Sequence, residues 1–190
     1  TMVLSGTKAS TPSYVNSQGE AEVSFPGTVM LLREPPATCP PLPVQLGKLP
    51  FLSGFTDANG QVLTAPPWAA ATPGTCLVGG VERQGLQVQP PDLGQTMVAY
   101  ALNLPLEPAR FHCLVGLQDG SPSTGIAFII QANGMELARL NTVPGEPWRE
   151  LTADLSPWAG KPVVLSLITD SAGPFGGDWG RWGDPCLLSP

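Results

Sequence analysis

The chain has 190 residues and a mass of 19.8 kDa, enough for one domain with a hydrophobic core. Its 22 glycines and 23 prolines leave no stretch longer than about ten residues without either, which excludes a helical bundle and disfavours a doubly wound α/β fold. The net charge of −6, the scattered basic residues and the lack of a long apolar run exclude nucleic-acid binding and direct membrane insertion.

The first 43 residues are predicted to form an extended N-terminal arm and a Pro-rich connector, and residues 44–190 a separate domain. The arm contains two strand-like segments, AEVSF (21–25) and TVMLL (28–32), but is too small to make a core alone. Such segments are candidates for addition to the sheet of a neighbouring copy. The predicted assembly residues are Val23, Phe25, Val29 and Leu31.

From residue 51 onward, short apolar runs alternate with turn signals, which is typical of a β-sandwich. Asn133-Gly134 predicts a hairpin turn between two of these strands. The run 162–170 is apolar on both faces at its start, so it is predicted to be a central strand. The predicted strands are 96–104, 109–120, 125–134, 135–143, 148–155, 162–170 and a last one around PCLLS. The fold class is therefore all-β, an antiparallel β-sandwich (jelly roll) with an extended N-terminal arm.

Four cysteines are present, without a CxxC pair: Cys39, Cys76, Cys113 and Cys186. An even number in a strand-and-turn protein favours two disulfides and an oxidising, extracellular compartment. The alternative is four buried thiols in a cytosolic chain.

The residues for catalysis are scarce. His112 is the sole histidine and alternates with core positions on a predicted strand, and no GxSxG motif accompanies it. Acids that could serve glycoside hydrolysis are as numerous as chance predicts, so we expect no enzyme. Asp170, Asp178 and Asp184 lie in or beside a Gly-rich segment and are candidate Ca²⁺ ligands, with turn capping as the alternative. No other cofactor is expected.

Five tryptophans lie near predicted turns or strand ends. An exposed indole can stack on the apolar face of a sugar ring, whereas a buried one closes the end of a sandwich. Trp158 and Trp179 are expected to close the ends, and Trp68 and Trp182 are candidates for either role.

Three segments carry a family resemblance: GLQVQPPDLGQTMVAYALNLP, FHCLVGLQDGSPSTGIAFIIQANG and PWRELTADLSPWAGKPVVLSLITDSAGPFGGDWGRWGDPCL. Over about residues 79–190 the chain resembles carbohydrate-binding-type jelly rolls, close to the NPCBM and galactose-binding-like groups. The resemblance implies that Asp178 and Trp179 organise the end of the sandwich. The predicted ligand-binding residues are Trp68, Trp182, Asp178 and Trp179.

In such sandwiches the last strand returns beside an earlier one. This implies a disulfide between Cys113 and Cys186 and leaves Cys39 to pair with Cys76, although four cysteines allow three connectivities.

Two functions are compatible with these features. The first is a non-catalytic extracellular module whose partners are glycans. The alternative is a structural subunit of an extracellular filament or surface layer, whose partners are copies of itself joined through the arm.

Overall fold

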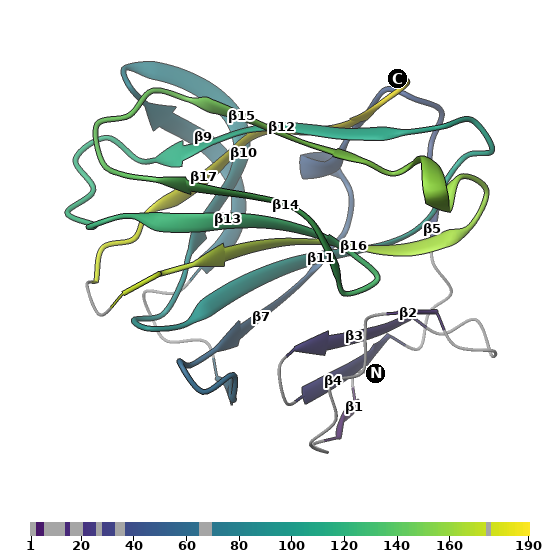
Figure 1. The fold of residues 1–190 in the computed structure, drawn as a ribbon, viewed down its shortest axis with the longest axis horizontal. Helices are drawn as coiled ribbons and strands as arrows, with labels where there is room; N and C mark the ends of the chain where they lie inside the picture. Colours follow the sequence, from purple (N-terminus) through teal and green to yellow (C-terminus); the bar gives the residue numbers. More distant parts are fainter. Residues whose placement is uncertain are drawn as a thin grey trace.

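The computed structural model describes residues 37–64, 70–173 and 176–190, together with the backbone of four short strands before them. These residues form three β-sheets and two single-turn 3₁₀ helices. Two of the sheets stack as a sandwich, and the third lies beneath it (Figure 1). The predicted antiparallel β-sandwich is thereby confirmed. Within the described residues, no helix has the length and apolarity needed to cross a membrane.

The first sheet of the sandwich has the strand order β15-β12-β17-β10-β9, with β6 paired beside β17. All of its pairings are antiparallel. Its strands are β6 (Val44–Gln45), β9 (Ala70–Val78), β10 (Val81–Gln89), β12 (Arg110–Leu117), β15 (Arg149–Asp154) and β17 (Gly180–Leu188).

The second sheet has the order β14-β13-β16-β11-β7-β8, and β5 adds to β11 in parallel. Its strands are β5 (Ala37–Thr38), β7 (Leu52–Thr56), β8 (Val62–Leu63), β11 (Gln95–Asn103), β13 (Ile126–Ala132), β14 (Met135–Thr142) and β16 (Pro162–Asp170). The 3₁₀ helices η1 (Leu46–Lys48) and η2 (Ser156–Trp158) lie in the connections. Strand β16 lies between β13 and β11, which confirms the prediction of a central strand.

The core fills the space between these two sheets because strand residues alternate between faces. Its largest fully buried side chains are Tyr100, Phe111, Phe128 and Trp182. The indole of Trp182 packs edge-to-face on Phe128, with ring centroids 5.1 Å apart. Full burial of rings of this size contributes on the order of 2–3 kcal/mol each to the stability of the sandwich.

A second hydrophobic cluster lies on the outer face of the second sheet. Val163 and Leu165 point into the core, so Val164 between them points outward, yet it is equally buried. The members of this cluster come from β11, β13 and β16: Met97, Ala99, Ile129, Val164 and Ile168. This explains why the sequence of β16 is apolar on both faces.

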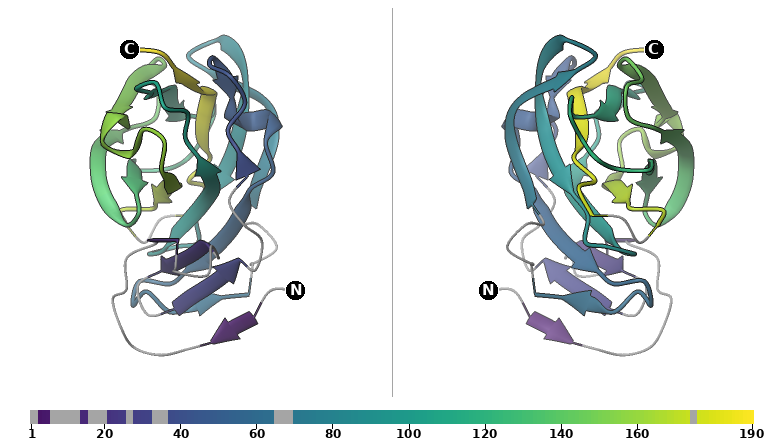
Figure 2. Two further views of the ribbon diagram at one scale, coloured as in Figure 1. Left: turned by 90° about the vertical axis from the view of Figure 1, so that its right-hand side faces the viewer. Right: turned by 90° about the vertical axis from the view of Figure 1, so that its left-hand side faces the viewer.

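The arm forms a small sheet of its own outside the sandwich. It has the order β1-β4-β3-β2, built from β1 (Val3–Ser5), β2 (Tyr14–Val15), β3 (Ala21–Phe25) and β4 (Thr28–Leu32). Both side views show these purple strands at the end of the molecule away from the C-terminus (Figure 2). Strands β2 and β3 contact β16, so the arm sheet meets the outer face of the second sheet.

The predicted assembly residues lie on the two inner strands of this arm sheet. Val23 and Phe25 are on β3, which pairs with β2 and β4, while Val29 and Leu31 are on β4, which pairs with β1 and β3. Within one chain β4 is therefore paired on both edges at Val29 and Leu31, whereas the β2 pairing of β3 covers only Ala21 and Glu22. Addition to a neighbouring copy stays a prediction, as does the domain boundary after residue 43; β5 and Cys39 already contact the sandwich before that boundary.

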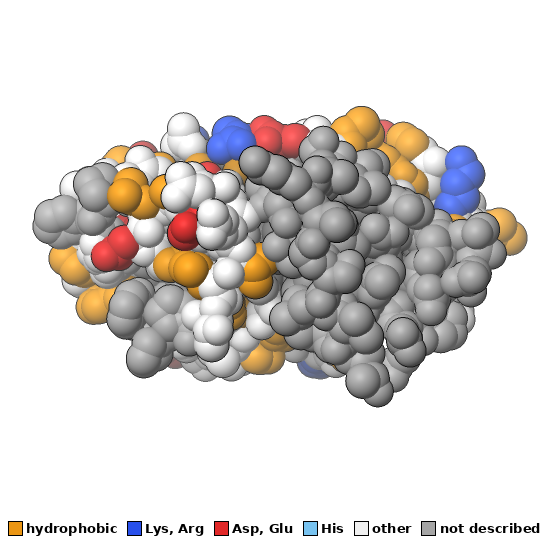
Figure 3. All heavy atoms as spheres, turned by 90° about the horizontal axis from the view of Figure 1, so that it is seen from below, with side chains coloured by type: hydrophobic (Ala, Val, Ile, Leu, Met, Phe, Trp, Pro, Cys, Tyr) orange, Lys and Arg blue, Asp and Glu red, His pale blue; other side chains and the backbone are white. Residues whose placement is uncertain are grey.

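The face seen from below carries few cations among the described residues. In Figure 3 exposed hydrophobic and acidic side chains lie on the left part of this face, and lysine and arginine side chains appear at its rim.

Candidate functional site

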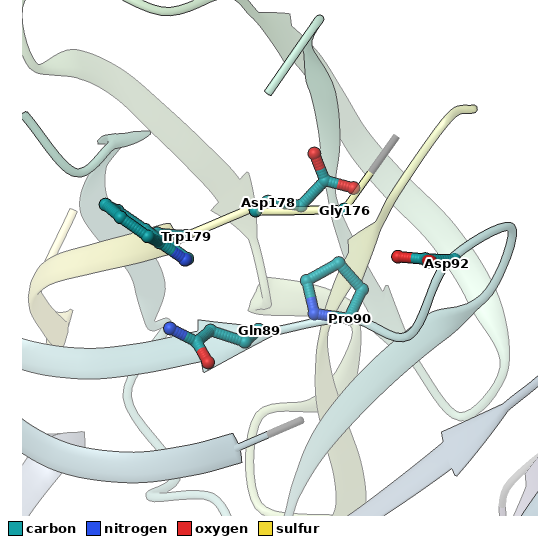
Figure 4. A pocket seen from close by; sticks show the side chains of 7 residues that line it. Gln89, Pro90, Asp92, Gly176, Asp178 and Trp179 are labelled. Atoms are coloured by element: carbon teal, nitrogen blue, oxygen red, sulfur yellow. The ribbon is translucent and has the colours of Figure 1, made fainter. Parts of the chain in front are cut away.

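A pocket of about 270 Å³ opens at the end of the sandwich where β10 runs into β11 and β16 runs into β17. We call it the carboxylate pocket; its lining residues are Gln89, Pro90, Asp92, Gly176, Gly177, Asp178 and Trp179. Figure 4 shows Trp179 and Gln89 on one side, Asp92 on the other, and Pro90 between them. This volume lies near the lower end of the range for small-molecule sites.

Asp178 is the most buried acid of this pocket. Only 4% of the residue is exposed, and its Oδ1 accepts a hydrogen bond from the hydroxyl of Ser123. Its Oδ2 is buried and has no partner among the described residues. Burial raises the pKa of Asp178 to about 6; the Ser123 hydrogen bond opposes this rise, and the nearby charge of Asp92 adds to it. The carboxyl group thus retains unused hydrogen-bonding capacity.

The segment around Gly177 is held by the loop between β12 and β13. The carbonyl of Gly177 accepts hydrogen bonds from the Ser121 hydroxyl (2.7 Å) and from the Trp179 amide (2.9 Å), and the Trp179 carbonyl accepts from the Gln118 amide (2.9 Å). Gly177 has φ +90°, and a Cβ there would lie 2.4 Å from Pro122 Cγ. Only glycine fits this position, so the backbone beside Asp178 is fixed.

A second pocket of about 330 Å³ uses the other half of the β10–β11 loop. We call it the turn pocket; it is lined by Thr56, Asp57, Ala58, Asn59, Gly60, Leu93, Gly94, Gln95 and Asp170. Its acids are already engaged. Asp57 accepts hydrogen bonds from the amides of Asn59 and Gln61, and these bonds lower its pKa. Asp170 accepts from Gln95 Nε2 and from the Ala172 amide.

The predicted ligand-binding residues are only partly brought together. Asp178 and Trp179 both line the carboxylate pocket, and Trp179 is half-buried rather than enclosed. The prediction that Trp182 binds a ligand is wrong. Its side chain is fully buried in the core and donates its indole N–H to Thr169 Oγ1, so no sugar can reach it. The alternation of side chains along β17 turns the indole into the core between the sheets. Trp68 lies outside the described residues and stays a prediction.

Sequence reasoning missed Gln89 and Asp92. They follow a strand in the segment QVQPPDLG, and nothing local distinguishes them from ordinary turn residues. Asp92 and Asp178 line the same pocket only because the loops after β10 and β16 share one end of the sandwich.

The predicted Ca²⁺ site is also corrected. Among the described residues, no group of three acidic, His or Cys side chains is placed to hold a metal. Asp184 instead pairs with Arg83, with 2.7 Å between Oδ2 and Nη1, while Asp170 caps the start of its own loop. Turn capping, the alternative considered for these acids, is what Asp170 does.

Both predicted disulfides are corrected, because all four thiols are free and buried. Cys186 lies opposite His112 rather than Cys113, and a β-bulge follows His112. Cys113 packs in the core and its thiol faces the Leu151 carbonyl. Cys39 packs beside the second sheet, whereas Cys76 lies on β9 at the edge of the first sheet.

One arrangement on the outer face of the first sheet has the residue types of a nucleophile, a base and an orienting acid. Cys186 Sγ lies 4.0 Å from His112 Nδ1, and His112 Nε2 lies 3.3 Å from Glu150 Oε1. Burial, however, raises the pKa of the Cys186 thiol, which disfavours the thiolate that attack requires. None of these residues lines either pocket.

The sequence matches no protein-family model and no curated protein. The fold, by contrast, is similar to solved carbohydrate-binding modules. A tandem pair of CBM51 modules from the family 98 glycoside hydrolase of Streptococcus pneumoniae SP3-BS71 gives a TM-score of 0.58 at 12% identity over 86% of this chain. The chain spans about half of that structure, 54% of its length.

Two further structures match as nearly complete domains. The CBM51 of Clostridium perfringens GH95, solved with methyl-galactose, has a TM-score of 0.54 at 16% identity, covering 77% of this chain and 99% of that one. The K1 cleaved adhesin domain of Lys-gingipain from Porphyromonas gingivalis W83 has a TM-score of 0.50 at 16% identity, covering 78% and 98%. The chain therefore has the fold of a carbohydrate-binding jelly roll, as the sequence resemblance implied.

Proposed function

We propose that this chain is a non-catalytic glycan-binding module that acts outside the cell and binds its ligand in the carboxylate pocket. The observation that carries the proposal is the composition of that pocket: an indole, a side-chain amide and two carboxyl groups around a space for a small ligand. The similar structures are carbohydrate-binding and adhesin domains, which supports both the ligand class and the extracellular location.

The chemistry of the pocket suits a sugar ring. A pyranose has one apolar face, which packs on an indole such as Trp179, and hydroxyl groups around its rim, which donate to carboxylates. Asp92 is exposed and makes no hydrogen bond or ion pair with any other described residue, so both of its oxygens are available. Gln89 adds a side chain that both donates and accepts.

Isothermal titration calorimetry tests this function. The full chain is titrated with a panel of methyl glycosides, including methyl-galactose, and compared with the Trp179→Ala variant. We expect at least about a tenfold loss of affinity in the variant, since stacking and burial of one indole contribute about 1–2 kcal/mol.

The matched control is Trp158→Ala, which removes a half-buried indole from η2 at the opposite end of the sandwich. This variant should bind as the wild type does. Unchanged binding by Trp179→Ala would place the ligand elsewhere, and failure of the wild type to bind any glycan would contradict the function.

Self-association through the arm is the second candidate, supported by the separateness of the arm sheet. This sheet shares no strand pairing with the sandwich in the part of the chain that the structure describes, and it contacts an apolar outer face. An arm of this kind can be donated to a neighbouring copy, where its strands add to the sheet of that copy. Light scattering of the full chain and of a chain lacking residues 1–32 tests it: assembly that persists without the arm contradicts this candidate.

A further inference from the structure

The carboxylate pocket is unusual in its charge. Two of its seven lining residues are aspartates, and none is a lysine, arginine or histidine. A Cβ built on Gly176 would lie 3.3 Å from Asp92 Oδ1, so the Asp92 carboxyl group sits directly beside the segment that carries Asp178. Figure 4 shows the Asp92 side chain reaching toward the middle of the pocket from one side and Asp178 above it.

The two acids differ in how far their side chains are exposed to solvent. Asp92 is exposed, whereas Asp178 is 4% exposed and its Oδ2 has no hydrogen-bond partner among the described residues. A buried carboxylate beside a second one is costly unless it gains a proton or a cation. The raised pKa of Asp178 shows that gaining a proton is one way to remove this cost. Binding a cationic group of the ligand is the other way.

We propose that the carboxylate pocket selects sugars that carry a free ammonium group, that is, hexosamines without an N-acetyl group. This inference rests on the proposed function and narrows its ligand class. The ammonium group lies between Asp92 and Asp178, and the sugar ring extends toward Trp179.

Hydrogen-bond chemistry ranks the possible sugars. An ammonium group donates three hydrogen bonds and neutralises charge, while a hydroxyl group donates one and leaves both carboxylates charged. Hydrogen bonds to charged donors are roughly twice as strong as neutral ones. A uronic acid or sulfated sugar would bring a third anion into a site without a cation. The expected order is hexosamine, then neutral hexose, then uronic acid.

Calorimetric titration of the full chain at pH 7.5 tests this order with methyl glycosides of glucosamine and galactosamine, their N-acetyl forms, the parent hexoses and the corresponding uronic acids. We expect the free amines to bind about tenfold more tightly than the N-acetyl forms. Asp92→Asn and Asp178→Asn should each abolish this preference and keep binding of neutral sugars.

The matched control is Glu107→Gln, which removes one exposed negative charge in the loop between β11 and β12, at the other end of the sandwich. It should keep the preference for amines, and thermal unfolding verifies that each variant folds.

Equal affinity for amines and neutral sugars overturns the inference and leaves the proposed function standing. Preference for uronic acids, or an amine preference that survives both Asp→Asn variants, overturns it too. So does tight binding of Ca²⁺ alone that excludes the amines. Absence of binding to every sugar overturns the proposed function together with the inference.

Discussion

The carboxylate pocket and the turn pocket share one loop and similar residue types, yet their acids are in opposite states. In the turn pocket Asp57 and Asp170 accept hydrogen bonds from the chain's own amides and from Gln95. In the carboxylate pocket Asp178 keeps one oxygen without a partner. The number of acids around a pocket therefore says little about binding. What counts is whether the fold has already used their hydrogen-bonding capacity.

The backbone that holds Asp178 should be the part of the site most sensitive to mutation. Gly177→Ala places a Cβ against Pro122 at a positive φ, so we expect a loss of about 2–4 kcal/mol of stability. Gly120→Ala is the matched control, because Gly120 also has a positive φ but no atom within 4 Å of its Cβ position. That variant should lose only about 1 kcal/mol. Equal losses in urea denaturation would show that packing against Pro122 is not limiting.

The next effect concerns the charge of Asp178. Its pKa is raised to about 6 in the folded chain, above its ordinary value near 4. Between pH 4 and pH 6 the folded state therefore keeps a proton on Asp178 that the unfolded state releases. The free energy of unfolding should therefore fall as the pH rises from about 4 to 7, by about 2–3 kcal/mol from this group. Asp178→Asn should be more stable than the wild type at pH 8 and should lack this decline. A decline of equal size in the variant would assign the pH dependence to another group.

A smaller effect follows from the donor that Asp178 does have. Ser123→Ala removes the hydrogen bond to Oδ1 and also the acceptor of the Gly125 amide. We expect a loss of about 1–3 kcal/mol at pH 8 and a smaller loss at pH 4, where the carboxyl group is protonated. Denaturation at both pH values measures the difference. Equal losses of stability at pH 4 and pH 8 would show that the hydrogen bond from Ser123 does not stabilise the charged form of Asp178.

A mutation of Asp170 in the turn pocket should have little effect on binding. Asp170→Asn changes an acid whose oxygens the fold already uses, so glycan affinity should stay within about twofold of the wild type. Asp92→Asn, measured beside it by calorimetry, should weaken binding of amino sugars. A larger effect of Asp170→Asn would move the binding site to the turn pocket.

The sandwich itself was predictable because its strands carry local signals. Strand β16 matches the predicted 162–170 residue for residue, since its apolar run ends at turn residues on both sides. The Asn133-Gly134 turn is also confirmed, with both residues at positive φ between β13 and β14.

The site was not predictable to the same extent. Its acids come from loops that are far apart in sequence. Only the order of strands in the sheets brings Asp92 and Asp178 to the same pocket. The role of Trp182 stayed open between stacking and burial, because it lies in the Gly-rich segment GDWGRWGDP, which resembles a loop. In the structure it belongs to β17, and pairing with Leu86 and Val115 fixes its inward direction.

Two tryptophans three positions apart give the molecule separate optical signals. Trp179 is half-exposed at the carboxylate pocket, and Trp182 is fully buried with its N–H bonded to Thr169. An indole near water emits at longer wavelength and is accessible to a quencher such as acrylamide, whereas a buried indole emits at shorter wavelength and is shielded. Occupancy of the pocket should therefore change the part of the red-side emission that comes from Trp179, and unfolding should remove the blue-side emission of Trp182.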